Sequence, residues 1–197
     1  MFKRDLHGRN ALITGAGRRI GRAIALNLAK AGWRVAIHYF RSVSAAEEVV
    51  KEVKAAGGYA ASFGSDLSEE KTPSELIETV ASAFGPITCL VNNASMFEHD
   101  TIFTATPKTW DLHMGVNLRA PFELAQSFAR QLPMESEANI INIIDQRVWN
   151  LTPDFTTYTL SKVGLWGLTQ ILARALAPKV RVNGVGPGPT AQSVHQS

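Results

Sequence analysis

Short apolar segments alternate with longer amphipathic segments along nearly the whole chain. The short segments are almost continuous runs of aliphatic and β-branched residues, as in strands that are buried on both faces of a sheet. They cover residues 10–14, 34–40, 59–64, 87–92, 139–144 and 180–185. Between these runs, the spacing of apolar positions predicts helices over residues 20–31, 44–56, 72–84, 108–117, 121–132 and 155–176.

Glycine and proline mark several of the predicted boundaries. Gly32 and Gly57 each follow a predicted helix, and Gly85-Pro86 ends a third. Strands that alternate with helices of about a dozen residues indicate βαβ units. The pattern therefore predicts an α/β fold with a Rossmann-type, doubly wound parallel sheet. No repeat or linker divides the sequence, so we expect a single domain over residues 1–197.

Composition excludes several other classes of protein. No apolar run approaches the ~20 residues of a membrane-spanning helix, so we expect no membrane partner. The net charge is only +3 and the basic residues are spread along the chain, which argues against nucleic-acid binding. The single cysteine, Cys89, lies in a predicted strand, so we expect a buried thiol and a cytoplasmic location. The five histidines show no ligand-like spacing, so we expect no metal site.

The segment between the first predicted strand and helix reads TGAGRRIG over residues 14–21. Glycines at such a turn let the backbone approach a pyrophosphate closely, and the following helix N-terminus stabilises the anion. We therefore predict a dinucleotide-binding turn at this point. The residues expected to bind the cofactor here are Gly15, Gly17, Arg18, Arg19, Ile20 and Gly21.

The end of the second predicted strand indicates which dinucleotide binds. An acidic residue there would bind the ribose 2′-hydroxyl and repel a 2′-phosphate, but residues 38–42 read HYFRS. Arginines from this segment and from the glycine-rich turn can clamp a 2′-phosphate, to which a serine can donate. We therefore predict NADP(H) as the cofactor. The residues expected to contribute are His38, Tyr39, Arg41 and Ser42.

Tyr158 and Lys162 lie four residues apart in a predicted helix, so they share one face of it. A tyrosine with an ordinary pKa of ~10 is a poor acid–base group near neutral pH. We expect the ammonium group of Lys162 to lower the pKa of Tyr158 into the working range.

Together these motifs resemble the short-chain dehydrogenase/reductase family. Asp66, the Asn92-Asn93-Ala94 motif, Asn117 and the Pro187-Gly188 turn follow in the order and spacing of that family. The resemblance implies that Asp66 contacts adenine, that Asn117 is a structural and proton-relay residue, and that Pro187-Gly188 meets the nicotinamide. The further cofactor-binding residues that it implies are Asp66, Leu67, Asn93, Ala94, Ser95, Lys162, Pro187 and Gly188.

Asp145 occupies the position at which the family usually has its catalytic serine. An ionised carboxylate cannot donate a hydrogen bond, and its charge repels a developing oxyanion. This disfavours ketone reduction and favours a C=N bond in a nitrogen heterocycle, where hydride goes to carbon and a proton to nitrogen. Gln146, Arg147 and Trp149 follow directly and are expected to line the substrate pocket.

Three departures from the family pattern resemble one subgroup, the pteridine reductases. They are Arg19 in the turn, Asn-Asn-Ala-Ser with Phe97 two residues later, and Asp145. The resemblance implies an NADPH-dependent reductase of pteridine or dihydrofolate-type substrates. In it, Phe97 stacks the pterin against the nicotinamide, and Lys162 holds the ribose. The substrate-binding residues would be Ser95, Phe97, Asp145 and Tyr158, and the catalytic residues Asp145, Tyr158, Lys162 and Asn117.

Two other functions stay open. Tyr158 and Lys162 also permit a general carbonyl or 3-oxoacyl reductase, and a fold alone does not exclude a nucleotide-binding sensor without turnover. Family members usually continue beyond Pro187-Gly188 with a substrate lid, a helix and a seventh strand. We therefore expect the last helix and strand to be missing here, and a homodimer or homotetramer at full length.

Overall fold

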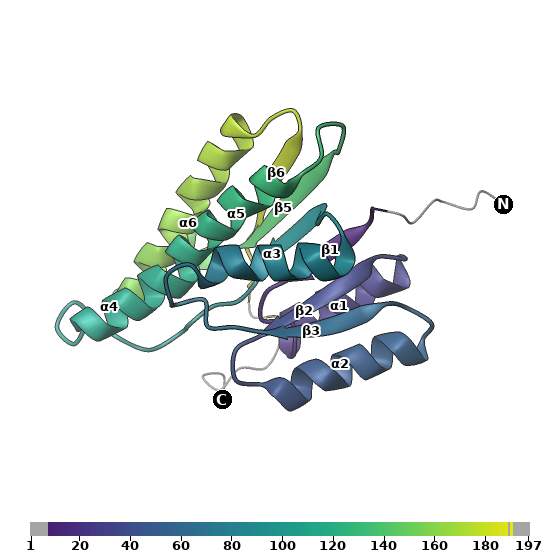
Figure 1. Cartoon of the computed structure of the whole chain (residues 1–197). Helices are drawn as coiled ribbons and strands as arrows, with labels where there is room; N and C mark the ends of the chain where they lie inside the picture. The colour runs from purple at the N-terminus through teal and green to yellow at the C-terminus, as the bar shows by residue number, and fades with distance from the viewer. Residues whose placement is uncertain (1–7, 189, 191–197) are drawn as a thin grey trace.

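The structure, a computed structural model, describes residues 8–188 and residue 190. Six parallel strands form one sheet in the order β3-β2-β1-β4-β5-β6 (Figure 1). The strand order reverses between β1 and β4, which is the arrangement of a Rossmann-type sheet, so the predicted fold class is confirmed. The strands are β1 Asn10–Ile13, β2 Arg34–Tyr39, β3 Ala60–Gly64, β4 Cys89–Asn92, β5 Ala138–Ile143 and β6 Val180–Val185.

Helices cover both faces of the sheet (Figure 1). The α-helices are α1 Arg19–Lys30, α2 Val43–Ala55, α3 Thr72–Phe84, α4 Pro107–Met114, α5 Ala120–Gln131 and α6 Thr156–Ala175. A π-helical turn, η1 Gly115–Arg119, joins α4 to α5, and a short 3-10 helix, η2 Gln146–Val148, follows β5. No helix in the described part of the chain is both long and apolar enough to span a bilayer.

Successive strand residues point to opposite faces and meet different helices. Leu12 and Leu90 pack in a cluster with α3 and α5, whereas Ile13 and Val91 pack with α1 and α2. Burial on both faces explains the continuous apolar runs of the strands. Cys89 belongs to this core, where burial raises the pKa of its thiol to about 12, so the thiol is inert at neutral pH.

The structure differs from the predicted elements at two places that matter for the site. The helix predicted to begin at Phe155 begins at Thr156, because Phe155 has a left-handed backbone with φ of 59°. The segment around Asn117, predicted as the end of one helix, lies in the π-helical turn. The polar segment 191–197, which bears on the prediction of a missing lid, lies outside the described residues.

Candidate active site

A cavity of about 940 Å³ lies at the carboxyl ends of the parallel strands. Ligands bind at this edge of open α/β sheets because the strand order reverses there. Every residue predicted to bind the cofactor or the substrate lies on the wall of this cavity, together with Gln146, Arg147 and Phe155. Two expected residues, Asn117 and Trp149, are not among the described residues of the wall.

The glycine-rich turn is locked to the end of β4. The Asn93 side chain donates to the carbonyl oxygens of Thr14 and Gly15 at 2.8 and 3.1 Å. The Thr14 hydroxyl accepts from the backbone N–H groups of Asn93 and Ala94, both at 2.9 Å. A Cβ atom on Gly21 would lie 2.4 Å from the Gly15 carbonyl oxygen, so glycine is required at that position. The side chain of Arg18, which precedes α1, makes no capping hydrogen bond, and the positive end of the α1 dipole favours an anion there.

His38 braces the same turn from β2. Its Nδ1 accepts from the backbone N–H of Gly15 at 3.1 Å, and its Nε2 faces the carbonyl oxygen of Ser65 at 3.1 Å. A carbonyl can only accept, so Nε2 carries the proton and the ring is neutral. Burial lowers the pKa of His38 to about 4, although the Ser65 bond acts in the opposite direction. His38 is therefore uncharged at neutral pH.

Three arginines give one end of the cavity a positive charge. Arg18, Arg19 and Arg41 all line it, and no acidic side chain follows β2 directly. Arg19 has φ of 50°, a conformation that favours glycine, so an arginine there is retained at a conformational cost. Asp66, beyond β3, uses one carboxylate oxygen to accept from the N–H and the hydroxyl of Ser68, at 2.9 and 2.7 Å.

Asp145 and Tyr158 form a hydrogen-bonded pair on the cavity wall. The phenol donates to Oδ2 of Asp145 at 2.7 Å, and Oδ1 accepts from the backbone N–H of Arg147 at 2.9 Å. Burial is the main cause that raises the pKa of Tyr158 above its ordinary value, followed by the charge of Asp145 and this hydrogen bond. Arg147 only partly offsets these effects. Tyr158 is thus a phenol at neutral pH, which suits a proton donor.

The expectation that Lys162 lowers the pKa of Tyr158 was wrong for this structure. The Lys162 ammonium donates to the carbonyl oxygen of Ile143 at 2.9 Å and lies 5.7 Å from the centre of the Tyr158 ring. Burial lowers the pKa of Lys162 itself to about 8, against the opposing charge of Asp145. The spacing of Tyr158 and Lys162 indicated a shared helix face, but not the burial and the Asp145 charge that raise the pKa of the phenol.

An aromatic wall bounds the cavity beside Tyr158. The Phe97 ring stacks on Phe155 at 4.5 Å with an angle of 9° between planes, and meets Tyr158 edge-on at 4.6 Å. The Arg147 guanidinium lies 4.8 Å from the centre of the Phe155 ring and 5.6 Å from that of Phe97. Sequence reasoning missed Phe155, because nothing in the sequence signals its left-handed backbone.

Asn117 is buried behind the wall and binds the loop that carries Ser95. Its side-chain oxygen accepts from the N–H of Met96 at 2.8 Å and from the Ser95 hydroxyl at 3.2 Å. Its amide donates to the Met96 carbonyl and to the Ser161 hydroxyl, both at 3.0 Å. This geometry gives Asn117 a structural role, and its part in a proton relay stays a prediction.

Trp149 packs edge-on against Trp166, with ring centres 6.0 Å apart, so the expectation that it lines the pocket was wrong. Among the residues that the structure describes, no group of three potential metal ligands is found.

Comparison with known proteins identifies the family of this chain. The chain belongs to the short chain dehydrogenase family, which matches residues 9–197. It is 35% identical over 181 residues to the 3-oxoacyl-[acyl-carrier-protein] reductase FabG of Staphylococcus epidermidis, covering 91% of this chain and 74% of the relative. The family predicted from the sequence is therefore confirmed.

The solved structures that resemble this chain include proteins described as dihydrofolate reductases. FolM alternative dihydrofolate reductase 1 from Brucella canis, complexed with NADP, superposes with a TM-score of 0.91 at 42% identity, over 96% of this chain and 77% of that one. A short chain dehydrogenase from Burkholderia cenocepacia in complex with NADP gives 0.88 at 36% identity, over 93% and 75%. The predicted cofactor is the one that these structures contain.

Proposed function

We propose that this protein is an NADPH-dependent reductase of pteridine or dihydrofolate-type substrates. The observation that carries the proposal is the Asp145–Tyr158 hydrogen bond on the cavity wall. It places an acceptor-only carboxylate and a protonated phenol side by side. A pterin ring offers N–H donors to the first and a ring nitrogen to be protonated by the second.

The residues on the cavity fit a bound dinucleotide phosphate. Gly15 and Gly21 allow the close packing of the turn, and the N-terminus of α1, towards which the turn leads, attracts an anion such as a pyrophosphate. Arg18, Arg19 and Arg41 would bind the 2′-phosphate, as its charge requires. When bound, NADPH supplies the hydride.

The protein's own part in the reaction is to hold the substrate and deliver a proton. Tyr158 gives its proton to the substrate nitrogen. The Asp145 carboxylate then takes up a proton from solvent and donates it to the Tyr158 phenolate along their shared hydrogen bond, which restores both groups. Asp145 also accepts from the ring N–H groups and so fixes the orientation of the heterocycle. Phe97 offers the flat surface on which such a ring stacks. The FolM structures, described as alternative dihydrofolate reductases, support this substrate class.

A second function, reduction of 3-oxoacyl thioesters, is favoured by the FabG relatives. The two functions make opposite predictions for Asp145→Ser. A serine would donate to a ketone oxygen and preserve or raise ketone reduction, whereas pterin reduction would lose its acceptor.

The test is NADPH oxidation by the purified protein with dihydrobiopterin, dihydrofolate and a panel of ketones and 3-oxoacyl thioesters. We expect turnover of a dihydropterin that falls at least about 100-fold in Asp145→Ala and in Tyr158→Phe. Asp111→Ala and Tyr59→Phe, which change exposed residues away from the cavity, serve as matched controls. Turnover of ketones or thioesters alone would instead support the second function. NADPH binding without any turnover would support a sensor.

The oligomeric state and the cellular location of the protein are further proposals. We expect a homodimer or homotetramer in the cytoplasm, and sedimentation of the purified protein measures the first of these.

A further inference from the structure

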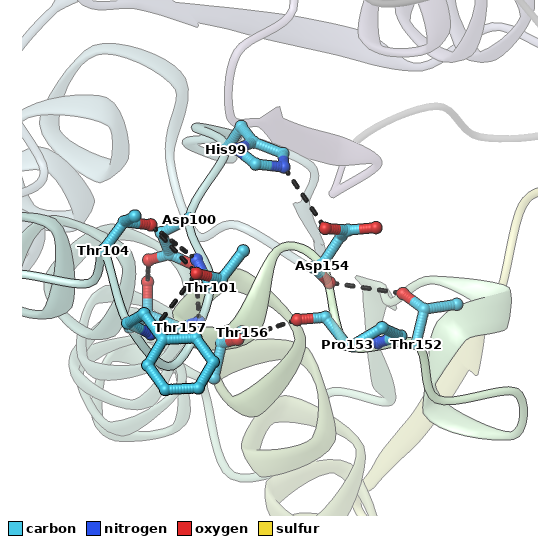
Figure 2. Close-up of polar contacts among 10 residues, drawn as sticks. His99, Asp100, Thr101, Thr104, Thr152, Pro153, Asp154, Thr156 and Thr157 are labelled. Atoms are coloured by element: carbon cyan, nitrogen blue, oxygen red, sulfur yellow. Dashed lines mark hydrogen bonds and ion pairs between the residues drawn. The ribbon is translucent and has the colours of Figure 1, made fainter.

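Asp100 lies in the loop after β4, is only 1% exposed, and contacts the start of α6 (Figure 2). Its carbonyl oxygen accepts from the backbone N–H groups of Phe155 at 2.7 Å and Thr156 at 3.4 Å. Its carboxylate accepts from the N–H of Thr157 at 3.1 Å and from the Thr157 hydroxyl. One residue therefore satisfies three backbone donors and one side-chain donor of a segment 57 positions away in sequence.

The start of α6 needs such an outside acceptor. The first N–H groups of a helix have no partner within the helix, and a Ser, Thr, Asp or Asn at the preceding position usually supplies one. Phe155 occupies that position here and has no hydrogen-bonding side chain. Asp100 replaces the missing cap from the loop that also carries Phe97.

A buried histidine completes the network and fixes its direction. The backbone N–H of Glu98 donates to Nε2 of His113 at 3.0 Å, so the ring proton is on Nδ1. Nδ1 lies 2.6 Å from the Thr157 hydroxyl and donates to it, and that hydroxyl then donates to Asp100. The positions of the proton on Nδ1 of His113 and of the Thr157 hydroxyl proton are therefore both determined. His113 is fully buried, with its ring centre 6.0 Å from that of Tyr158.

The network joins the two segments that make the substrate end of the cavity. One segment carries Phe97 and the other carries Phe155 and Tyr158, and the three rings are in contact. At the surface, His99 and Asp154 approach to 3.4 Å across the same junction (Figure 2). Their exposed contact adds little, so the buried bonds of Asp100 determine how the segments fit.

We propose that Asp100, Thr157 and His113 are a positioning unit, which sets Tyr158 and the Phe97–Phe155 pair in the arrangement needed for proton delivery. The unit acts on the chemical step and leaves cofactor binding alone, because the glycine-rich turn is locked by Asn93 instead. The proposal rests on the proposed reductase activity but not on the identity of the substrate.

The test compares Thr157→Val, which removes the hydroxyl at nearly constant shape, with Thr157→Ser, which keeps it. Thr156→Val removes a neighbouring exposed hydroxyl and is the matched control. Single-turnover hydride transfer is followed by stopped flow at saturating NADPH. The substrate is dihydrobiopterin, or a 3-oxoacyl thioester if the wild type reduces the thioester and not the pterin. The amplitude measures the fraction of competent enzyme, and the rate constant measures positioning.

We expect Thr157→Val to slow hydride transfer about tenfold to 100-fold at full amplitude, since misplacement of a reacting group by about 1 Å has that effect. Thr157→Ser should recover the rate to within about threefold, and the Kd for NADPH should change less than about twofold in every variant. A fall in amplitude with an unchanged rate constant would show a merely structural role and overturn the proposal. So would a wild type that transfers hydride to neither substrate.

Asp100→Asn and the state of His113 give a second measurement if Thr157→Val fails to fold. Asparagine has one acceptor oxygen in place of two, so either the hydroxyl or the backbone N–H of Thr157 would lose its acceptor, and the same loss of rate is expected. Nitrogen-15 shifts of His113 in the wild type must show a proton on Nδ1 and none on Nε2. The opposite tautomer would overturn the proposal whatever the substrate. Pterin failure with thioester success would overturn only the proposed function.

Discussion

Asp145 and Tyr158 share one hydrogen bond, which raises the pKa of the phenol although a lysine lies on the same helix face. Burial is the main cause of this raised pKa and the charge of Asp145 adds to it, so the spacing of Tyr158 and Lys162 does not decide the protonation of the phenol. The identity of residue 145, which follows β5, thus affects the pKa of Tyr158 in α6. The hydroxyl of a serine at position 145 would not exert this effect, because it carries no charge.

Asp145→Asn should lower the pKa of Tyr158 towards its ordinary value, because the amide carries no negative charge to oppose the phenolate. Arg147→Met should act in the opposite direction, since the guanidinium favours the phenolate. Ultraviolet titration, corrected with Tyr158→Phe, follows the phenolate without any need for activity. We expect Tyr158 to ionise at a lower pH in Asp145→Asn than in the wild type, and not to ionise in Arg147→Met before the protein unfolds in alkali. If Tyr158 ionised at the same pH in Asp145→Asn as in the wild type, the charge of Asp145 would not be a cause of the raised pKa.

At the scale of elements, the turn from β1 into α1 depends on contacts with β4. Asn93 binds two carbonyl oxygens of the turn, and Gly21 packs against one of them. The motif was visible in the sequence because glycine spacing is local. The contact with Asn93 was not, since it joins residues 79 positions apart. The π-helical turn around Asn117 and the left-handed Phe155 were likewise unpredictable, because tertiary contacts hold them.

Gly21→Ala should weaken NADPH binding at least about tenfold, because a Cβ atom 2.4 Å from the Gly15 carbonyl oxygen forces the turn to move. Gly167→Ala is the matched control, since its Cβ atom would meet nothing within 4 Å in α6. Fluorescence titration with NADPH measures both. Equal affinity in the two variants would show that the turn tolerates displacement.

At the scale of the whole molecule, the alternation of apolar segments was enough to predict a doubly wound sheet and the edge at which ligands bind. Burial of both faces explains why, because each strand must be apolar throughout. Residue identities also indicated the charged end of the cavity. They did not reveal that Asp100 would cap α6, since that contact forms only when distant segments pack together.

His38 should make the stability of the whole domain depend on pH. Its pKa is about 4 in the folded state and 6.5 when unfolded, so the unfolded state binds more protons between these values. Stability is therefore full above pH 6.5 and falls as the pH drops towards 4, by about 2 kcal/mol between pH 7 and pH 5. Urea unfolding should show this fall reduced in His38→Asn and unchanged in His99→Asn, an exposed control. A fall of equal size in His38→Asn would exclude His38 as its source.

The position of β1 in the middle of the sheet also affects when the cofactor site can form during synthesis of the chain. The glycine-rich turn and the arginines are translated within the first 42 residues, yet β1 pairs with both β2 and β4. Until Asn93 has emerged and β4 has docked, the turn is braced by His38 of β2 but lacks its hydrogen bonds with Asn93. We therefore expect cofactor binding to come late in folding, once the two halves of the sheet have joined. Tyr158 and α6 are synthesised later still and are followed by β6.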